Sequence, residues 1–306
     1  GADSPAVPGA AERKGSMIWF GPAGSSESFY AMGYKAAYQS PEYLAKFGLN
    51  AYEYQCGRGV RVSPEAAAKL KAGSREHGIR LSLHSPYYIS LSSVEEEKRQ
   101  GSIRYILQSA AAARLMGAGR VVVHSGSAAK LPRGEALELA KDTLRRALDA
   151  LDAEGLGDIT LCPETMGKLG QLGTLEEVMA LCGVDERLIP CIDFGHLYAR
   201  TLGGLQTRED FEAIFRTMDS ALGRDRMRVF HAHFSKIQYT ENGGEKMHLT
   251  FADTRYGPEF EPLAEMILRY GCSPVIICES AGTQAEDAAA MKTMYEAKKR
   301  QLEAAN

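Results

Sequence analysis

The sequence has no apolar stretch approaching the roughly 20 residues that a membrane-spanning helix needs. It also has no excess of positive charge, since 36 Lys and Arg residues face 39 Asp and Glu residues and give a formal net charge of -3. Any attraction to phosphate groups must therefore come from a local basic surface. We expect a soluble, cytoplasmic protein with no membrane partner. The net charge neither supports nor excludes a nucleic-acid partner.

The six cysteines include no Cys-x-x-Cys pair, and most lie among apolar residues. This pattern is typical of the reduced, core-filling thiols of a cytoplasmic protein. Cys162 and Cys191 each stand two residues before an acidic residue that ends a strand-like run. Because side chains alternate along a strand, we expect both thiols to point into the core beneath those acids, where burial makes them unreactive.

Residues 1–16, GADSPAVPGAAERKGS, are small, polar and rich in Pro and Gly. They lack the apolar segment of a secretory signal, and we interpret them as a tag or linker outside the fold. A regular pattern begins at Met17. Because α/β barrels of roughly 250 residues form single domains, we expect one domain over residues 17–306.

Eight short segments are apolar or β-branched with little alternation, which is typical of strands buried on both faces. They are MIWFG, AYEYQ, RLSLH, RVVVH, ITLCPE, LIPCID, MRVFHAHF and VIICE. Helical segments lie between them: Ser63 and Pro64 begin one, and Thr174 begins another that Gly183 ends. This alternation predicts an α/β protein with a single (β/α)8 TIM barrel.

Polar residues end six of these strands, although an unpaired charge beside a buried strand is costly. The residues are His84, His124, Glu164, Asp193, His231 and Glu279. In a (β/α)8 barrel the carboxyl ends of the strands surround one active-site mouth, so these side chains should converge there. Imidazole and carboxylate ligands together favour zinc or manganese over calcium. The sequence therefore predicts a multinuclear metal site.

Taken singly, each of these residues has a simpler explanation. A strand-end histidine can be a hydrogen-bonded structural residue, and Asp193 or Glu279 can cap the following helix. Six such coincidences at equivalent points of one barrel favour the metal site. His77, in contrast, lies at a helix end in SREHG, and we interpret it as a solvated residue outside the site.

Motifs that follow five of the strands resemble the endonuclease IV type of apurinic/apyrimidinic endonuclease, within the wider xylose-isomerase-like barrels. They are HSPYYISL, VVVHSG, LCPETMGKLGQLGT, CIDFGHLYARTLG and ICES, and the resemblance runs from Met17 to the C-terminus. It implies that His84, His124 and Glu164 hold one ion. Glu164 would bridge to a second ion held by Asp193, His231 and Glu279, and His196 and His248 would hold a third.

The resemblance also implies the chemistry, which is hydrolysis of the DNA backbone 5′ to an abasic site during base excision repair. Two or three zinc ions, with manganese as an alternative, would share a hydroxide and clamp the phosphate oxygens, so that no protein nucleophile is needed. Glu164 and Glu279 would be the catalytic carboxylates. The implied partner is DNA that contains abasic sites, and a monomer is the default because the helices are ordinarily amphipathic.

Two departures from the family pattern affect the third ion and the seventh strand. The family has an Asp-x-His pair where this chain has Glu245-Lys246-Met247-His248, so that lysine takes the aspartate position. Glu245 could replace the aspartate, Lys246 could supply the missing positive charge, or the site could hold two ions. His233 should point to the same side as His231, as an extra ligand, a phosphate contact or a hydrogen-bonding neighbour of the ligands.

Basic and aromatic residues in the loops around the mouth are candidates for DNA contacts. Tyr87 matches a position that the family uses to wedge DNA, and the other candidates are Arg58, Lys168 and Lys236. Taken singly, each basic residue is more often a solvated loop charge.

Two other functions remain open from the sequence. A sugar isomerase or epimerase of the same barrel superfamily would need one ion at Glu164, Asp193, His231 and Glu279, with two carboxylates moving protons beside a carbonyl. The additional histidines at 84, 124, 196 and 248 favour the hydrolase. The second alternative is a nucleic-acid-binding barrel that has lost catalysis through the change at Lys246.

Overall fold

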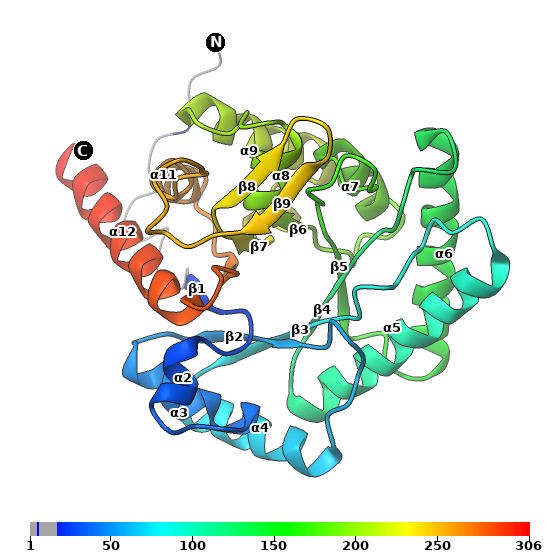
Figure 1. The fold of residues 1–306 in the computed structure, drawn as a ribbon, viewed down its shortest axis with the longest axis horizontal. Coiled ribbons are helices and arrows are strands. Elements are labelled where there is room, and N and C mark those ends of the chain that lie inside the picture. The colour runs from blue at the N-terminus through cyan, green and yellow to red at the C-terminus, as the bar shows by residue number, and fades with distance from the viewer. Residues whose placement is uncertain (1–4, 6–16) are drawn as a thin grey trace.

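The computed structural model describes Pro5 and residues 17–306, so the predicted tag or linker over residues 1–16 lies outside the described residues except for Pro5. Eight parallel strands surround a central axis, and helices cover them on the outside (Figure 1). This arrangement confirms the predicted single (β/α)8 barrel. None of the helices in the described ranges is long and apolar enough to cross a membrane.

All eight predicted strands are present in the barrel. They are β1 (Trp19–Pro22), β2 (Ala51–Gln55), β3 (Arg80–His84), β4 (Arg120–Val123), β5 (Thr160–Pro163), β6 (Cys191–Asp193), β7 (His231–Phe234) and β10 (Val275–Cys278). The seventh is shorter than predicted, because Gly223 adopts a positive φ of 86° and Arg224–Arg228 then form the short helix α10.

The strands pair as two parallel four-stranded sheets, in the orders β1-β10-β7-β6 and β2-β3-β4-β5. Isolated parallel bridges join the sheets, one between Ala23 and Glu53 and one between Glu164 and Cys191. At the first junction the backbones approach so closely that a Cβ on Gly21 would lie 1.6 Å from the carbonyl oxygen of Ala51. The two bridges close the barrel, and each contains a buried glutamate.

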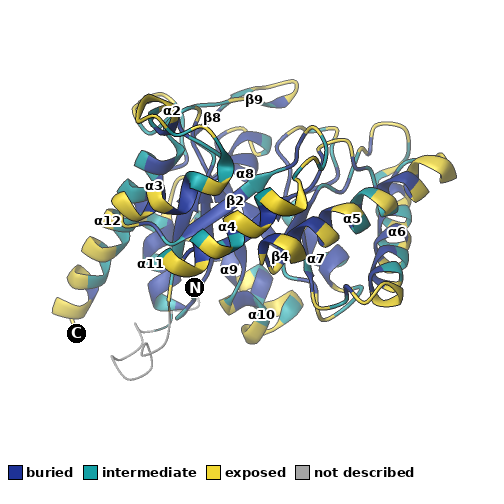
Figure 2. Ribbon diagram, turned by 90° about the horizontal axis from the view of Figure 1, so that it is seen from below, coloured by how far each residue is buried: buried dark blue, intermediate teal, exposed yellow. Residues whose placement is uncertain are grey.

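The other helices follow the strands in the expected order. They are α2 (Glu27–Ala31), the 3-10 helix η1 (Ala37–Gln39), α3 (Ser40–Lys46), α4 (Pro64–His77), α5 (Glu96–Met116), α6 (Arg133–Ala153), α7 (Leu175–Cys182), α8 (Phe194–Arg200), α9 (Arg208–Leu222), α11 (Glu261–Arg269) and α12 (Gln284–Ala304). Their exposed faces point outward and their buried faces point toward the strands (Figure 2).

Local signals set the predicted helix ends. The Ser63 hydroxyl accepts a hydrogen bond from the Ala66 N–H at 3.1 Å and caps α4, as predicted. Thr174 and Glu177 form a reciprocal capping box at the start of α7. Gly183 ends α7 in a right-handed conformation, so its role there does not depend on the left-handed freedom of glycine.

An antiparallel hairpin, β8 (Ile237–Thr240) and β9 (Gly244–His248), is inserted between β7 and α11 and was not predicted. It rises above the barrel at the end opposite to α10 (Figure 2). Because β7 leads directly into it, the hairpin lies at the carboxyl ends of the strands, beside the mouth.

Candidate metal centre

Three groups of potential metal ligands adjoin one another at the carboxyl ends of the strands. The first cluster is His84, His124 and Glu164; the strand quartet is Glu164, Asp193, His233 and Glu279; the hairpin cluster is His196, Glu245 and His248. Within each group the ligand atoms all lie within 4.8 Å of one another. The structure thus brings together seven of the eight predicted ligands and adds His233 and Glu245, two of the residues predicted as possible contacts.

Glu164 connects the first cluster to the strand quartet through its two carboxylate oxygens. Its Oε1 lies 3.2 Å from Nε2 of His84 and 3.1 Å from Nε2 of His124, and its Oε2 lies 2.9 Å from Nδ1 of His233. Two ligands that are each about 2.0–2.2 Å from a shared ion are roughly 2.8–3.6 Å apart, depending on the geometry. The spacings around Glu164 therefore fit a carboxylate that bridges two ions.

The proton arrangement at His84 also favours an ion. Its Nδ1 lies 2.7 Å from the Ser85 carbonyl oxygen, which can only accept, so Nδ1 carries the proton. Nε2 is then the nitrogen left to bind an ion, and it faces Oε1 of Glu164.

Two buried carboxylate oxygens of the strand quartet have no hydrogen-bond partner. They are Oδ2 of Asp193 and Oε1 of Glu279, whereas Oδ1 of Asp193 accepts the His196 N–H at the start of α8. Burial raises the pKa of Glu279 well above its usual value against the opposing attraction of His233, and the nearby carboxylates of Asp193 and Glu164 raise it further. A divalent cation would satisfy both oxygens and offset this repulsion, so the donor set fits zinc or manganese.

The hairpin cluster contains a carboxylate, although lysine takes the position where the resemblance predicts an acid. Oε1 of Glu245 lies 3.3 Å from Nε2 of His196, and its Oε2 lies 3.7 Å from Nε2 of His248. Burial opposes the charge of Glu245, but the neighbouring His196 outweighs it and lowers the Glu245 pKa to about 2.

A β-bulge explains why the acid of this pair can stand three residues before His248 rather than two. Glu245 pairs with Tyr239 and Met247 pairs with Gln238, so Lys246 has no partner opposite it. Residues three apart point to opposite faces of a regular strand, but an extra residue in a bulge restores the same face. Glu245 and His248 therefore lie on the same face, as the members of an Asp-x-His pair would, while Lys246 is exposed. Among the three explanations offered by the sequence, the geometry agrees with the one in which Glu245 takes the place of the aspartate.

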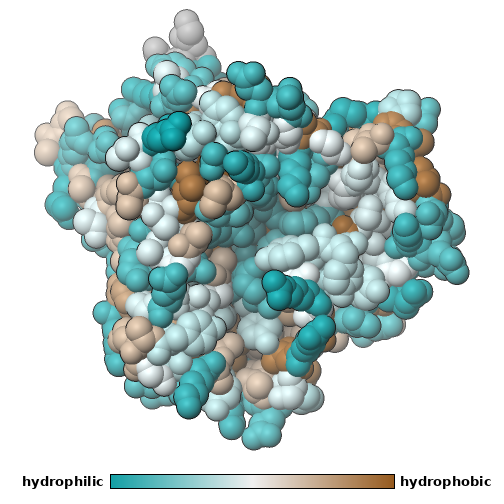
Figure 3. Space-filling view, in the orientation of Figure 1, coloured by the Kyte–Doolittle hydropathy of each residue, from teal (hydrophilic) through white to brown (hydrophobic). Residues whose placement is uncertain are grey.

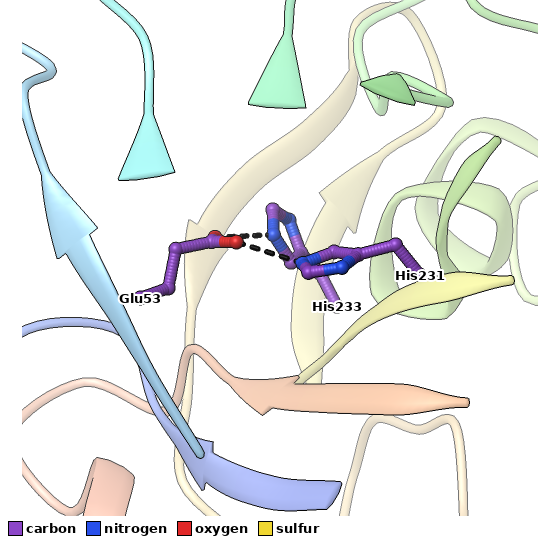
Figure 4. Close-up of side chains that lie close together, drawn as sticks. All are labelled: Glu53, His231 and His233. Carbon is purple, nitrogen blue, oxygen red and sulfur yellow. Dashed lines mark hydrogen bonds and ion pairs between the residues drawn. The ribbon is translucent and has the colours of Figure 1, made fainter. Parts of the chain in front are cut away.

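The structure places His233, rather than the predicted His231, beside Asp193 and Glu279. Nδ1 of His233 lies 3.6 Å from Asp193 and 3.3 Å from Glu279, whereas Nε2 of His231 lies 2.8 Å from Oε1 of Glu53 (Figure 4). Both rings point into the barrel. His231 is two residues further from the carboxyl end, which places it about 6–7 Å deeper at about 3.3 Å per residue.

Sequence reasoning missed Glu53, which is 0% exposed inside β2. Its carboxylate accepts hydrogen bonds from Ser82, His231 and His233. The available signal was a single charge in the middle of AYEYQ, since a charge inside a buried strand needs partners. Cys162 and Cys191 pack with Val122 in a small apolar cluster and are fully buried, as predicted. Burial raises the pKa of the Cys162 thiol to about 11, which keeps it protonated.

The predicted DNA contacts separate into two groups. Tyr87, which is 53% exposed, stacks on His124 with the ring centres 5.6 Å apart, and the side chains of Arg58 and Lys168 are also exposed. Lys236 is buried, and its Nζ donates to the carbonyl oxygens of Phe251 and Asp253; it is therefore a structural cation rather than a DNA contact. The surface at the mouth is hollowed and largely hydrophilic (Figure 3).

A family model described as "Xylose isomerase-like TIM barrel" matches residues 41–297. The chain belongs to this family. It is 32% identical over 86% of its length to an uncharacterized protein of Methanocaldococcus jannaschii, of which it covers 92%. It is 30% identical over 66% of its length to a probable endonuclease 4 of Symbiobacterium thermophilum, of which it covers 74%.

Two solved structures, one named as an epimerase-like protein and one as an endonuclease, share this fold. A D-tagatose 3-epimerase-like protein has a TM-score of 0.69 at 20% identity, over 92% of this chain and 98% of that one. The endonuclease IV of Thermus thermophilus has a TM-score of 0.62 at 22% identity, over 86% of this chain and 94% of that one. These likenesses establish the barrel, and the function must be argued from the site.

Proposed function

We propose that this protein is a metal-dependent phosphodiesterase that hydrolyses the DNA backbone 5′ to abasic sites. The observation that carries the proposal is the continuity of the three ligand groups, two of which share Glu164 while the third adjoins it: Nδ1 of His196 lies 3.4 Å from Oε2 of Glu164. A one-ion enzyme needs only the strand quartet. Two or three zinc or manganese ions would use all three groups.

The ions, when bound, would lower the pKa of water at neutral pH and neutralise charge on the phosphate oxygens. The protein's own contribution is to hold the ligands and to present carboxylates at fixed points. Glu164 is buried and aims one oxygen at each of two ligand groups. Glu279 has the most exposed side chain of the strand quartet, at 17%, so it faces the space where substrate enters. We assign Glu279 to orienting the attacking water and accepting its proton.

Substrate recognition would use the exposed rim. Tyr87 lies over His124 and is positioned to stack against a base or sugar beside the scissile bond. Arg58, in the loop after β2, and Lys168, in the loop after β5, are exposed and would contact phosphates. The proposal is supported by the names of relatives described as probable endonuclease 4, and it treats the protein as a cytoplasmic monomer acting in DNA repair.

The test is incision of a labelled duplex that contains one tetrahydrofuran abasic analogue, with the zinc- or manganese-loaded protein. We expect a single cut on the 5′ side that leaves a 3′ hydroxyl, no cut in the matching undamaged duplex, and loss of activity with a chelator. No incision by protein that holds two or three ions would contradict the proposal. Clean binding without incision would support the non-catalytic alternative.

A sugar epimerase is the second candidate, because the strand quartet has the carboxylates and the histidine that a one-ion epimerase would use. Metal content separates the two. About one ion per chain, together with exchange of a substrate C–H proton with deuterated water, would favour the epimerase. Two or three ions per chain would favour the phosphodiesterase.

A further inference from the structure

Beneath the strand quartet lies a row of three buried polar side chains that the proposed hydrolysis does not use, and it ends at His233 of the quartet. Arg120 (β4), His231 (β7), Glu53 (β2) and His233 (β7) follow one another from the barrel interior toward the mouth. His231, Glu53 and His233 are 0% exposed, and Arg120 is 7% exposed. Figure 4 shows the Glu53 carboxylate facing both histidine rings, with one contact to each.

The direction of each hydrogen bond follows from Arg120, at the inner end of this row of side chains. A guanidinium group can only donate, so the Nδ1 of His231, 3.4 Å from Arg120, accepts. A nitrogen that accepts carries no proton, so the proton of the His231 ring is on Nε2. That N–H donates to Oε1 of Glu53 at 2.8 Å.

Glu53 is surrounded by donors. Its Oε1 also accepts from the Ser82 hydroxyl at 2.9 Å, and its Oε2 lies 2.6 Å from Nε2 of His233. The Ser82 hydroxyl and the His231 N–H both donate to Oε1, as expected for a carboxylate, which can only accept. The carboxylate then accepts at Oε2 as well, so the His233 Nε2 carries a proton. In the neutral ring that metal binding requires, the lone pair of His233 is then at Nδ1, which faces Glu164, Asp193 and Glu279.

A metal ion bound by Glu53, His231 and His233 is the competing explanation of these contacts, since one potential ligand atom of each residue also lies close to the others. The distance of 2.6 Å between Glu53 Oε2 and His233 Nε2 is a hydrogen-bond length. It is shorter than the roughly 2.8–3.6 Å expected between two ligands of one ion. The spacings in the strand quartet are 2.9, 3.3 and 3.6 Å around the same histidine's other nitrogen. These spacings place the ion on the Nδ1 side of His233, toward the mouth, and a hydrogen bond on its Nε2 side, toward Glu53.

His233 differs from two other histidines of the site in which ring nitrogen it presents to the ligand groups. His84 and His196 direct Nδ1 at backbone carbonyl oxygens, of Ser85 at 2.7 Å and Thr165 at 2.8 Å, and present Nε2 to the ligand groups. His233 has the reverse orientation and a carboxylate as its partner. A carboxylate partner makes an imidazole a more basic ligand than a neutral oxygen does.

We propose that Glu53, itself oriented by Arg120, His231 and Ser82, is the positioning residue that fixes His233 as an Nδ1 ligand of the strand quartet. This inference rests on the metal-binding part of the proposed function, and it is independent of whether the substrate is DNA or a sugar. Glu53 touches neither substrate nor ion, and it acts through His233 alone. The expected effect is on ion affinity and on the identity of the ligating nitrogen.

The direct test is a long-range 1H–15N spectrum of the zinc-loaded protein, labelled at histidine. We expect His233 to show a zinc-bound Nδ1 and a protonated Nε2, and His84 and His196 to show the opposite pattern. Ligation of His233 through Nε2 would overturn the inference. This measurement uses the wild-type chain, so it does not depend on whether a variant folds.

The second test compares Glu53→Gln with Ser82→Ala by competition with a zinc chelator. In the glutamine variant an amide N–H₂ must face one of the two imidazole N–H groups. We therefore expect about 10- to 100-fold weaker binding of the ion in the strand quartet. Ser82→Ala removes one hydroxyl and keeps the carboxylate, and it should change affinity much less. Equal zinc affinity in a folded Glu53→Gln protein would refute the positioning role. Wild-type protein that binds neither zinc nor manganese would instead refute the proposed function.

Discussion

The strand quartet and the hairpin cluster are built from the same residue types on very different supports. Glu164, Asp193, His233 and Glu279 end or follow strands of the closed barrel, and the first three side chains are at most 1% exposed. Glu245 and His248 sit on the two-stranded hairpin, with side chains 15% and 29% exposed. The barrel fixes the first set through pairing on both sides of each strand, whereas the hairpin holds the second beside a bulge. We infer that the hairpin cluster binds its ion more weakly and exchanges it faster.

Glu164→Gln should have the largest effect of the substitutions in the ligand groups, because it removes the bridge between the first cluster and the strand quartet. An amide is a poorer ligand than a carboxylate and carries no charge to offset two cations. Since changes to partners of the ligands already cost about 10- to 100-fold in affinity, loss of the shared ligand should cost at least about 100-fold. Metal content measured by mass spectrometry should fall by two ions per chain, and unchanged content would contradict the shared role.

Glu245→Gln should remove one ion and leave the strand quartet loaded. The matched control is Lys246→Asp, which puts an acid at the position where the family has one. Because Lys246 is the exposed residue of the bulge, its replacement should neither add nor remove an ion. Chelator titration would measure both variants. An additional tight site in Lys246→Asp would show that the hairpin register differs from the one described.

The hairpin also explains which parts of the site could be predicted from sequence. The barrel was predictable because eight apolar runs alternate with helical segments, and six of the runs end in a polar residue within the same local segment. Glu245 was only one of three alternatives, since the face on which it lies depends on a bulge created by pairing with Tyr239. His231 and His233 could not be distinguished because alternation sends both rings inward and does not encode depth. Glu53 needed partners from β3 and β7, which are distant in sequence.

Gly167→Ala should disturb the hairpin cluster selectively and by less than the loss of a ligand. A Cβ at this position would lie 2.8 Å from both the Cβ and Oε1 of Glu245 and 3.0 Å from Cδ2 of His196. These atoms must shift, so we expect severalfold weaker binding of the hairpin ion and an unchanged strand quartet. Gly170→Ala, in the same loop, meets no atom within 4 Å and is the control. Equal ion affinity in the two variants would argue against the close packing of this loop on Glu245.

Glu177→Gln should have the smallest effect on the ions and a measurable effect on stability, because Glu177 anchors the loop that carries Gly167. Burial opposes its charge, but hydrogen bonds from Arg133 and from the N–H groups of Gly173 and Thr174 lower the Glu177 pKa to about 2. A lowered carboxyl pKa stabilises the fold above the unfolded value of about 4.5, and this contribution is lost as pH falls from about 4.5 to about 2. In the metal-free protein at pH 7 we expect Glu177→Gln to reduce the free energy of unfolding by about 1–3 kcal/mol. The exposed neighbour Glu176→Gln should change this free energy by less than about 0.5 kcal/mol.

The hairpin pairs with this loop through Lys168 and Gly244. Binding of the ion in the hairpin cluster should therefore weaken slightly before binding in the strand quartet does. A difference between wild type and Glu177→Gln that persists unchanged at pH 3 would show that the charge of Glu177 is not what holds the loop.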